Sequence, residues 1–407
     1  MTQIPVSIVV VSRHRPAALI RCLTGISQLR YAPFEVIVVA DPQGQDAVRR
    51  WPGAADVKVI GFDEPNISVA RNLGIEAASG EVVAFIDDDA VPEPGWLTHL
   101  ANPFNDVSVA AAGGFVRGRN GMSWQWQANS VDLAGTVRPL DVPNDAPLVL
   151  TPSPGRAIKT EGTNMAVRRS VLMRLGGFDP NFHYFLDETD LNLRLAQEGA
   201  ATAIVPRAVV HHGFAENAMR RGDRVPRDLR QMGASWAVFL ARYCPEVHVA
   251  ERWAAITASE RKRVLRHMVE GRLEPRDVRR ILKTLRDGFT EGAARPASPM
   301  DPMTGAGGAF HPFPSDPERS VVTVSGRVWS QGRIKAKAQD AANAGKIVCA
   351  YVFSPTTLFH KRIFTPEGYW LQTGGLFGKS LRSDPVLSLW RFGRRVAREA
   401  QLWSSFQ

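Results

Sequence analysis

The chain has 407 residues, of which 44% are hydrophobic, and it carries a formal net charge of +10. This length and composition predict a globular protein of two or three domains, and no apolar run approaches the roughly 18 residues of a membrane-spanning helix. Cys22, Cys244 and Cys349 have no zinc-motif spacing and their odd number argues against a disulfide framework, so we expect a reducing, cytoplasmic compartment.

Apolar strands and helix-like segments alternate through the first part of the chain. Residues 6–12 are predicted as a strand rather than a signal peptide, because no basic flank precedes them and no small-residue cleavage site is present. Further strands are predicted at residues 34–41, 55–62 and 81–89, and helices at residues 16–29 and 68–79. This β-α-β-β-α-β order predicts the α/β class, with a doubly wound, mostly parallel sheet.

Polar side chains stand at the carboxyl ends of three of these strands. Ser12 ends the first strand, Asp41 ends the second, and Asp87, Asp88 and Asp89 end the fourth. Ligands of doubly wound sheets bind beyond the carboxyl ends of the strands. Adjacent carboxylates repel one another unless they reach water or a cation lies among them. This edge of the sheet is therefore the predicted ligand site.

Composition divides the remaining chain. Residues 103–156 look like loops or short irregular strands over the sheet, and residues 216–290 are charged and helix-like. A stretch rich in Pro, Gly, Ala and Ser at 291–318 is predicted as a linker or long loop. The last part, 319–407, is predicted as a small α/β region that contains one β-α-β unit. The first domain would then comprise residues 1–215.

The positive charge is concentrated in the last part of the chain. Residues 320–407 contain 13 Lys and Arg and 4 Asp and Glu, a net charge of +9, so the rest of the chain carries about +1. This asymmetry indicates an anionic partner for the basic region, such as an acidic membrane surface, a phosphorylated acceptor or nucleic acid.

The acidic strand end has two interpretations. Carboxylates at i and i+2 on a turn can bind one Mg²⁺ or Mn²⁺, which would neutralise a diphosphate leaving group. An acidic turn in water explains the residues Asp87–Asp89 equally well. Asp41 likewise fits a helix N-cap as well as a ligand contact, and Arg71 fits a solvated first helical turn as well as a nucleotide contact.

A second acidic group and a histidine pair follow later. Asp187, Glu188 and Asp190 stand at the start of a predicted helix, where acids suit the helix dipole. One of them could also be a general base that deprotonates an acceptor hydroxyl. His211 and His212 end another apolar strand, and a histidine there could bind a metal or a phosphate.

Together and in this order, these segments resemble the inverting glycosyltransferases of the GT-A fold, specifically glycosyltransferase family 2. The matching stretches cover residues 4–215, about half of the chain, and their combination is specific. They are "VSIVVVSRHRP", "FEVIVVAD", "SVARNLGIEAASGEVVAFIDDDAVPEPGWL", "GTNMAVRRSVLMRLGGFDP", "DETDLNLRLAQEG" and "VVHHG".

The resemblance implies a role for each candidate residue. A nucleotide-diphosphate sugar would be the donor and a divalent metal, Mn²⁺ or Mg²⁺, the cofactor. The implied nucleotide-binding residues are Ser12, Asp41, Arg71, Asp87 and Asp88. Asp89 would bind the metal as the last acid of the D-x-D motif, and Asp87 would contact the ribose or the metal.

The implied catalytic base is the second acid of the family's acidic pair. That position falls on Glu188, while the order of the pair leaves Asp187 in play. His211 would match the family's late histidine near the diphosphate and metal, with His212 as the alternate. The implied sugar and acceptor pocket consists of Gly162, Thr163 and Asn164.

Two other functions compete with this interpretation. A strand that ends in D-x-D also resembles haloacid-dehalogenase-type phosphatases, in which the first aspartate, here Asp87, would be the nucleophile. That motif belongs on the first strand, whereas this one is on the fourth. A non-catalytic nucleotide-binding or surface-binding protein is the other alternative, but all candidate acids are present.

The basic region is interpreted as an accessory domain on the acceptor side. No nucleic-acid module appears in it, so we expect no nucleic-acid partner. Its last predicted helix, residues 386–403, combines basic and apolar residues. Peripheral docking on an anionic membrane, where a lipid-linked or saccharide acceptor would lie, is the sharper hypothesis, and an ordinary surface helix is the plainer one.

Overall fold

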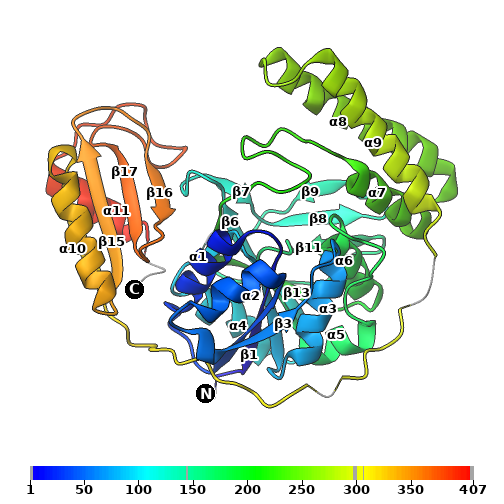
Figure 1. Cartoon of the computed structure of the whole chain (residues 1–407), viewed down its shortest axis with the longest axis horizontal. Helices are drawn as coiled ribbons and strands as arrows, with labels where there is room; N and C mark the ends of the chain where they lie inside the picture. Colours follow the sequence, from blue (N-terminus) through cyan, green and yellow to red (C-terminus); the bar gives the residue numbers. More distant parts are fainter. Residues whose placement is uncertain (1–2, 144, 297–299, 306, 404–407) are drawn as a thin grey trace.

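The computed structural model describes residues 3–143, 145–296, 300–305 and 307–403. A large twisted sheet with helices on both faces forms the body of the molecule, and two smaller parts project from it (Figure 1). One part is a helical hairpin, and the other is a separate small sheet near the C-terminus.

The predicted parallel strands are all present in the large sheet, which confirms the α/β fold class. Parallel pairing joins β2 to β1 and β3, and β4 pairs with the other edge of β1. Their bounds are β1 Val6–Ser12, β2 Phe34–Ala40, β3 Val57–Gly61 and β4 Val82–Asp87. The helices among and after them are α1 Pro16–Ile26, α2 Pro42–Arg49, α3 Ile67–Ala77 and α4 Trp96–Ala101. Strands β1, β2 and β4 are buried on both faces because helices cover both sides of the sheet, whereas the edge strand β3 is partly exposed.

The prediction for residues 103–156 misses a central strand. Strand β6 (Val109–Arg117) pairs with β12 and β13 inside the large sheet, although its Ala and Gly content gives a weak strand pattern. Short strands then form a three-stranded sheet over the site in the order β11-β8-β9. The remaining elements of this part are β5 Ala90–Pro92, β7 Trp124–Trp126, β8 Asn129–Asp132, β9 Val137–Pro139, β10 Leu148–Leu150, β11 Arg156–Lys159, β12 Met165–Arg168, α5 Arg169–Leu175, α6 Asp187–Gln197 and β13 Ala201–His212.

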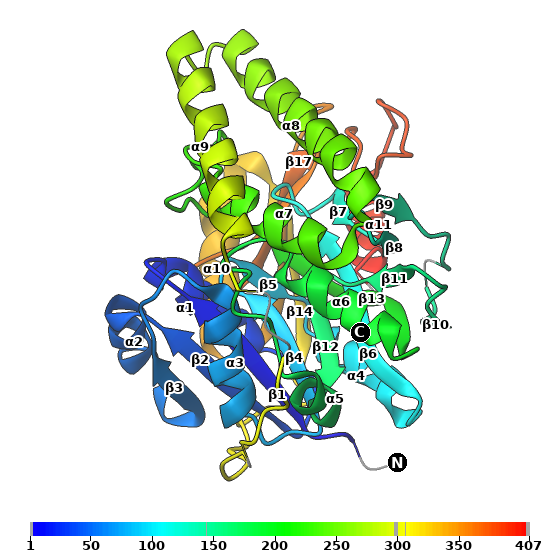
Figure 2. The ribbon, with the colours of Figure 1, turned by 90° about the vertical axis from the view of Figure 1, so that its right-hand side faces the viewer.

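Only part of the predicted helical segment 216–290 is helical. Residues 213–229 form an irregular loop, and the helices are α7 Arg230–Tyr243, α8 Glu246–Val269 and α9 Pro275–Ala293. Helix α7 packs on the body of the molecule through Trp236 and Phe239, whereas the α8–α9 hairpin projects from it (Figure 2). The loop residues are charged and polar, like those of the helices that follow, and this similarity led to the wrong helix prediction. They show no clear apolar periodicity, which is the signal that a packed helix would require.

The segment predicted as a linker lies along the surface of the first domain. Phe313 is buried and stacks on Phe34, with 5.3 Å between the ring centroids. The backbone N–H of His311 donates to the buried Glu35 side chain at 2.9 Å. Residues 297–299 and 306 of this prediction lie outside the described residues. The described part is irregular, as expected, but it is attached along its length.

The last region forms a four-stranded sheet in the order β14-β15-β17-β16. Strands β14, β15 and β17 are parallel, and the predicted β-α-β unit is β14-α10-β15. The bounds are β14 Val321–Arg327, α10 Gln331–Asn343, β15 Ile347–Ser354, β16 Lys361–Phe364 and β17 Trp370–Gly375. Its core includes Val91 and Met122 of the first domain, so the two regions share one apolar cluster.

The last helix is shorter than predicted. Helix α11 spans Phe392–Gln401, and residues 386–391 before it are not helical. Arg395 and Glu399 of this helix are buried, and the Glu399 carboxylate accepts a hydrogen bond from Gln372 at 2.7 Å. The helix therefore turns a polar face into its own domain, which a purely amphipathic surface helix would not do. Within the described residues, no helix is both long and apolar enough to span a bilayer.

Candidate functional site

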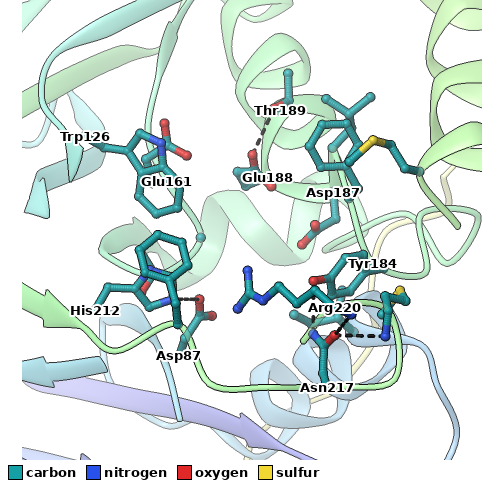
Figure 3. A pocket seen from close by; sticks show the side chains of 18 of the residues that line it. Asp87, Trp126, Glu161, Tyr184, Asp187, Glu188, Thr189, His212, Asn217 and Arg220 are labelled. Carbon is teal, nitrogen blue, oxygen red and sulfur yellow. Dashed lines mark hydrogen bonds and ion pairs between the residues drawn. The ribbon is translucent and has the colours of Figure 1, made fainter. Parts of the chain in front are cut away.

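Three potential metal ligands converge at the carboxyl edge of the large sheet. Asp87 ends β4, Asp89 lies in the turn after it, and His212 ends β13. One ligand atom of each lies within 4.8 Å of the others. His212 Nε2 is 3.2 Å from Asp89 Oδ1. It is 3.9 Å from Asp87 Oδ2, and both side chains are labelled in Figure 3. Two carboxylate oxygens and an imidazole nitrogen form a donor set that suits Mn²⁺ or Mg²⁺ with water completing the shell.

Positive and polar groups hold Asp89 ionised. Its burial would raise the pKa, but His212, Arg15 and the backbone N–H of Ala215 outweigh burial and lower the pKa of Asp89. The Ala215 N–H donates to Asp89 Oδ2 at 2.6 Å. Arg15 and Arg220 lie 3.5 Å and 3.9 Å from the same carboxylate. The two arginines also place positive charge beside the three potential metal ligands.

The middle aspartate of the acidic run points away from the cavity. Asp88 is fully buried, accepts a hydrogen bond from Ser12 Oγ at 2.7 Å and pairs with Arg15 at 2.6 Å. Asp88 lines neither of the two cavities described below, whereas Ser12 lines the second, so the nucleotide contact expected for Ser12 stays a prediction. Asp88 lies beneath the site and orients Arg15, because alternate residues of the turn face opposite sides.

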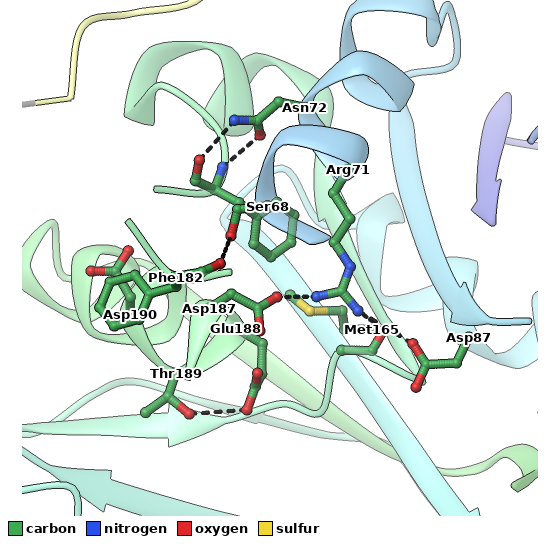
Figure 4. Close-up of polar contacts among 12 residues, drawn as sticks. Ser68, Arg71, Asn72, Asp87, Met165, Phe182, Asp187, Glu188, Thr189 and Asp190 are labelled. Carbon is green, nitrogen blue, oxygen red and sulfur yellow. Dashed lines mark hydrogen bonds and ion pairs between the residues drawn. The ribbon is translucent and has the colours of Figure 1, made fainter. Parts of the chain in front are cut away.

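Arg71 joins the two acidic groups predicted from the sequence. Its guanidinium pairs with Asp187, lies 3.3 Å from Asp87 Oδ1 and donates to the carbonyl of Gly162 at 3.2 Å (Figure 4). The Phe178 ring lies 5.1 Å from the guanidinium carbon. Arg71 is thus buried, which contradicts the solvated first turn that was its other interpretation, and it lines the cavity, so the expected nucleotide contact stays a prediction.

The neighbouring acids Asp187 and Glu188 have different environments. Burial raises the pKa of Asp187, although Arg71 opposes that shift. Burial would also raise the pKa of Glu188, but Lys159 and Arg71 outweigh burial and lower it. Lys159 Nζ lies 3.3 Å from Glu188 and 2.8 Å from Glu161. Glu188 is therefore an ionised carboxylate at the cavity wall, while Asp187 is committed to Arg71.

The two histidines of β13 face opposite sides. His211 Nε2 lies 2.9 Å from Glu93, and its ring lies 4.6 Å from the ring of Trp370 in the C-terminal region. Burial lowers the pKa of His211 to about 4, so the ring is neutral near pH 7. His212, the alternate in the sequence analysis, is the histidine at the acidic cluster, and the expected first choice His211 contacts the C-terminal region instead.

The three residues predicted to form the sugar and acceptor pocket do not all face the cavity. Gly162 and Thr163 line the cavity, whereas Asn164 is fully buried behind it. The Asn164 amide donates to the carbonyls of Phe115 and Ala208, both at 2.9 Å. Asn164 therefore ties β12 to neighbouring strands and has no free group for a substrate.

Asp41 contacts His14, which lines a second cavity beside the first. It caps α2 by accepting from the Gly44 N–H at 3.2 Å, and its other oxygen lies 3.0 Å from His14 Nδ1. The contact with Gly44 is that of a helix N-cap, which was one of the two interpretations of Asp41. This cavity, of about 380 Å³, is lined by the segment from Ser12 to Arg15 and by Phe62, among others.

The main cavity has a volume of about 600 Å³ and contains groups that sequence reasoning missed. His212, Asp87, Glu188 and Arg220 face the same hollow in Figure 3. The missed residues lie in distant parts of the chain and meet only in the folded protein: Arg15, Trp126, Lys159, Glu161, Tyr184, Asn217 and Arg220. Asn217 donates to Tyr184 Oη at 3.1 Å, which holds loop 213–229 over the cavity.

The comparisons with known sequences converge on one family. The family described as "Glycosyltransferase like family 2" matches residues 4–234, more than half of the chain. The chain is 30% identical over 218 residues to the pre-mycofactocin glycosyltransferase of Mycobacterium tuberculosis, covering 51% of this chain and 42% of that one. It is 31% identical over 163 residues to the glucosyl-dolichyl phosphate glucuronosyltransferase of Haloferax volcanii, covering 37% and 48%. The matched part thus spans less than half the length of these relatives.

Solved structures show a weaker likeness. GalNAc-T7 with UDP, GalNAc and Mn²⁺ has a TM-score of 0.43 and 16% identity, covering 59% of this chain and 48% of that one. Mannosyltransferase PcManGT from Pyrobaculum calidifontis, in complex with GDP-Man and Mn²⁺, has a TM-score of 0.42 and 18% identity, covering 74% and 78%. A likeness at this level says nothing about the ligand of this chain.

The phosphatase alternative is not favoured. Its nucleophile would be Asp87 on a first strand, but Asp87 ends the fourth strand and contacts Arg71 and His212. The family match includes this strand and both acidic groups, Asp87–Asp89 and Asp187–Glu188.

Proposed function

Because the chain belongs to the glycosyltransferase-like family 2 and its first domain has the GT-A fold, we propose that it is an inverting, metal-dependent glycosyltransferase. It would move a sugar from a nucleotide-diphosphate donor to an acceptor hydroxyl in polysaccharide or glycoconjugate synthesis. The acceptor would be a saccharide or a lipid-linked sugar.

One observation carries this proposal: the metal-binding group and an ionised carboxylate line the same cavity. Asp87, Asp89 and His212 stand at one wall and Glu188 at another, in a space of about 600 Å³. A cavity of several hundred Å³ is large enough for a small-molecule ligand. Metal at one wall and base at another is the arrangement that sugar transfer to a hydroxyl needs.

Asp87, Asp89 and His212 would hold the divalent cation, which when bound would neutralise charge on the donor diphosphate. Arg15 and Arg220 add fixed positive charge beside Asp89. Positive groups aimed at charge that develops in the transition state are a large source of rate acceleration. These residues would therefore stabilise the departing nucleoside diphosphate.

Glu188 would be the general base. Its carboxylate would take the proton of the acceptor hydroxyl as that oxygen forms a bond to the anomeric carbon. The bond from the anomeric carbon to the diphosphate oxygen breaks at the same time, and its electron pair leaves with the diphosphate. Attack opposite the leaving group inverts the anomeric centre and needs no covalent sugar–enzyme intermediate. Asp187 would instead fix Arg71 and, through it, Asp87.

The second cavity is the place for the nucleoside. It adjoins the main cavity, and Arg15, Asp87 and Tyr184 line both. Ile67, Phe62 and Val39 provide an apolar floor for a base, and Asn66 and Glu64 provide polar groups at its rim. Asp41 would act here through His14 and the N-terminus of α2.

Nucleotide titration tests this proposal. UDP, GDP and dTDP are titrated by calorimetry with and without Mn²⁺ into the wild type, Asp89→Ala and the control Glu251→Ala, whose side chain is 87% exposed. We expect Mn²⁺-dependent binding of one nucleotide, a loss of at least about tenfold in Asp89→Ala, and wild-type binding in the control. Absence of binding by every nucleotide in the wild type would refute the donor site.

A further inference from the structure

The C-terminal region exposes large apolar side chains at one edge of its small sheet. Strands β14, β15 and β17 are parallel, so their carboxyl ends lie along the same edge. The three loops that follow these strands contain the exposed side chains: Trp329 73%, Leu358 63%, Phe359 62%, Val386 65%, Leu387 57% and Leu389 87% exposed. Single exposed apolar residues are ordinary, but a group of this kind marks an interaction surface.

Backbone hydrogen bonds hold two of these loops together. Gly375 N–H donates to the carbonyl of Leu358 at 2.9 Å, and His360 N–H donates to that of Lys379 at 3.1 Å. On the other side, Ser388 N–H donates to the carbonyl of Phe377 at 3.0 Å. The loops after β15 and β17 are thus joined through residues 375–379, so Leu358, Phe359, Leu387 and Leu389 belong to one surface.

The charged residues around these loops are mostly basic. Arg382, Arg391 and Arg394 are exposed in the same segment, and Lys379 lies 5.9 Å from the Phe359 ring. The acid within the segment, Asp384, pairs with Arg398 and accepts from the Ser380 and Leu381 N–H groups. Within the described residues, Arg382, Arg391 and Arg394 form no ion pair, and apolar side chains among such cations fit a surface that is negatively charged outside and apolar within.

We propose that this surface, the loops 355–360 and 381–391, docks on an anionic lipid bilayer. Leu358, Phe359, Leu387 and Leu389 would enter the boundary between headgroups and acyl chains, while the arginines contact lipid phosphates. The docking element is therefore the extended segment before α11, not α11 itself, whose Arg395 and Glu399 are buried.

The arrangement of the whole molecule agrees with this surface. Figures 1 and 2 show the loops of the C-terminal sheet and the α8–α9 hairpin rising on the same side of the body. The end of that hairpin has a net positive charge, with Arg261, Lys262 and Arg266 exposed, although Arg272 pairs with Glu270 at 3.4 Å. Arg263 of α8 lines the main cavity, so the hairpin connects this side of the molecule to the proposed acceptor site.

Vesicle sedimentation with the full-length chain tests the surface. The vesicles are phosphatidylcholine alone or phosphatidylcholine with phosphatidylglycerol, and the proteins are wild type, Leu387→Ser/Leu389→Ser, Arg382→Glu/Arg391→Glu and the control Val107→Ser. Val107 is 88% exposed and precedes β6, at the opposite edge of the large sheet. We expect the wild type and the control to bind the anionic vesicles, and each double variant to bind at least about tenfold more weakly.

Other outcomes would overturn the proposal. Equal binding of all four proteins, or no binding of the wild type to anionic vesicles, would refute docking of this surface on lipid. Light scattering on the same proteins would reveal a second copy as the occupant, if the wild type is a dimer that Leu387→Ser/Leu389→Ser makes monomeric. Nucleotide titration of the double variants separates the two proposals, because the donor site should be unchanged whatever the vesicles show.

Discussion

The large sheet and the small sheet of this protein, both mixed but built on parallel strands, use the same edge for different chemistry. In the large sheet, the carboxyl ends of β4 and β13 present Asp87 and His212 to a cavity. In the small sheet, the carboxyl ends of β15 and β17 lead into loops that expose Phe359 and Leu389. Topology fixes where the loops gather, because all parallel strands end at one edge. The side chains on the loops then decide whether that edge binds a charged small molecule or an apolar surface.

The comparison also explains why the first edge is hollow and the second is not. Helix α7, loop 213–229 and the sheet β11-β8-β9 stand over the large sheet and enclose the cavity. No described element covers the loops after β15 and β17 in the same way, since Leu389 is 87% exposed. Enclosure strengthens electrostatic interactions, whereas an open apolar surface favours association with another apolar phase.

Of the substitutions considered, Glu188→Gln should lower activity most. It also distinguishes the cavity edge of the large sheet from the exposed edge of the small sheet. The change removes the proposed base without changing the size of the side chain, and we expect kcat to fall roughly 10²–10⁴-fold. Metal-dependent nucleotide binding should persist, because we propose that Glu188 acts on the acceptor and not on the donor. The measurement is single-turnover transfer to a water-soluble acceptor.

Leu389→Ser at the other edge is the matched control for that assay. We expect its transfer rate to a water-soluble acceptor to equal that of the wild type, since the residue is remote from the cavity lining. A Glu188→Gln enzyme with wild-type kcat would shift the role of base to Asp187. A slow Leu389→Ser enzyme would mean that the two edges are not separate.

The adjacent histidines allow the same comparison within one strand. His212→Ala should weaken Mn²⁺-dependent nucleotide binding by about 10–100-fold, because it removes one ligand atom of the metal group. His211→Ala should leave that binding in place but lower the free energy of unfolding by about 1–3 kcal/mol, because it removes packing on Trp370 and a bond to Glu93. Calorimetry and urea unfolding are measured on both variants. Equal effects of the two substitutions would contradict the finding that His211 and His212 face opposite sides of β13.

Lys159→Met should have the smallest effect, a shift in the pH profile. Lys159 and Arg71 lower the pKa of Glu188 below its ordinary value of 4.5, so the base is ionised at neutral pH and activity should fall only in acid. Removing Lys159 raises that pKa, and we expect the acid limb of kcat/KM to move upward by about one pH unit. Lys58→Met, which breaks a pair with the distant Glu35, is the control and should leave the limb in place.

The parallel part of the fold could be predicted because its strands are continuous apolar runs bounded by polar residues. Strand β6 was missed because Ala and Gly weaken the pattern, although close packing requires that composition. A Cβ on Gly114 would lie 2.0 Å from the carbonyl oxygen of Ala208. A close approach between distant strands leaves no periodic signal in the sequence.

The acidic residues of the candidate site could be predicted from the sequence, but the direction in which each side chain points could not. Asp87, Asp89 and Glu188 do line the cavity, whereas Asp88 and Asn164 are buried away from it. The choice between His211 and His212 depends on the face of β13, and the register of β13 shifts between Val205 and Val209. Such an irregularity breaks the two-residue alternation from which a face could be inferred.

The basic members of the site had no sequence signal of their own. Arg15, Lys159 and Arg220 come from three separate segments, and each is one of 50 Lys and Arg in the chain. Only tertiary structure brings Arg15 and Arg220 to Asp89 and Lys159 to Glu188. Acids at strand ends are recognisable because topology places them, while their counter-ions can come from anywhere.

The apolar cluster shared by the two regions affects the order in which the protein can be completed during synthesis. Val91 and Met122 emerge from the ribosome more than 200 residues before their covering partners Tyr351, Trp370 and Trp403. Until then, the nascent first domain keeps an apolar face beside β13, whose His211 also awaits Trp370. We expect the nascent chain to depend on holding factors until Trp403 has been made, and a gene shortened before residue 320 to yield a protein that aggregates.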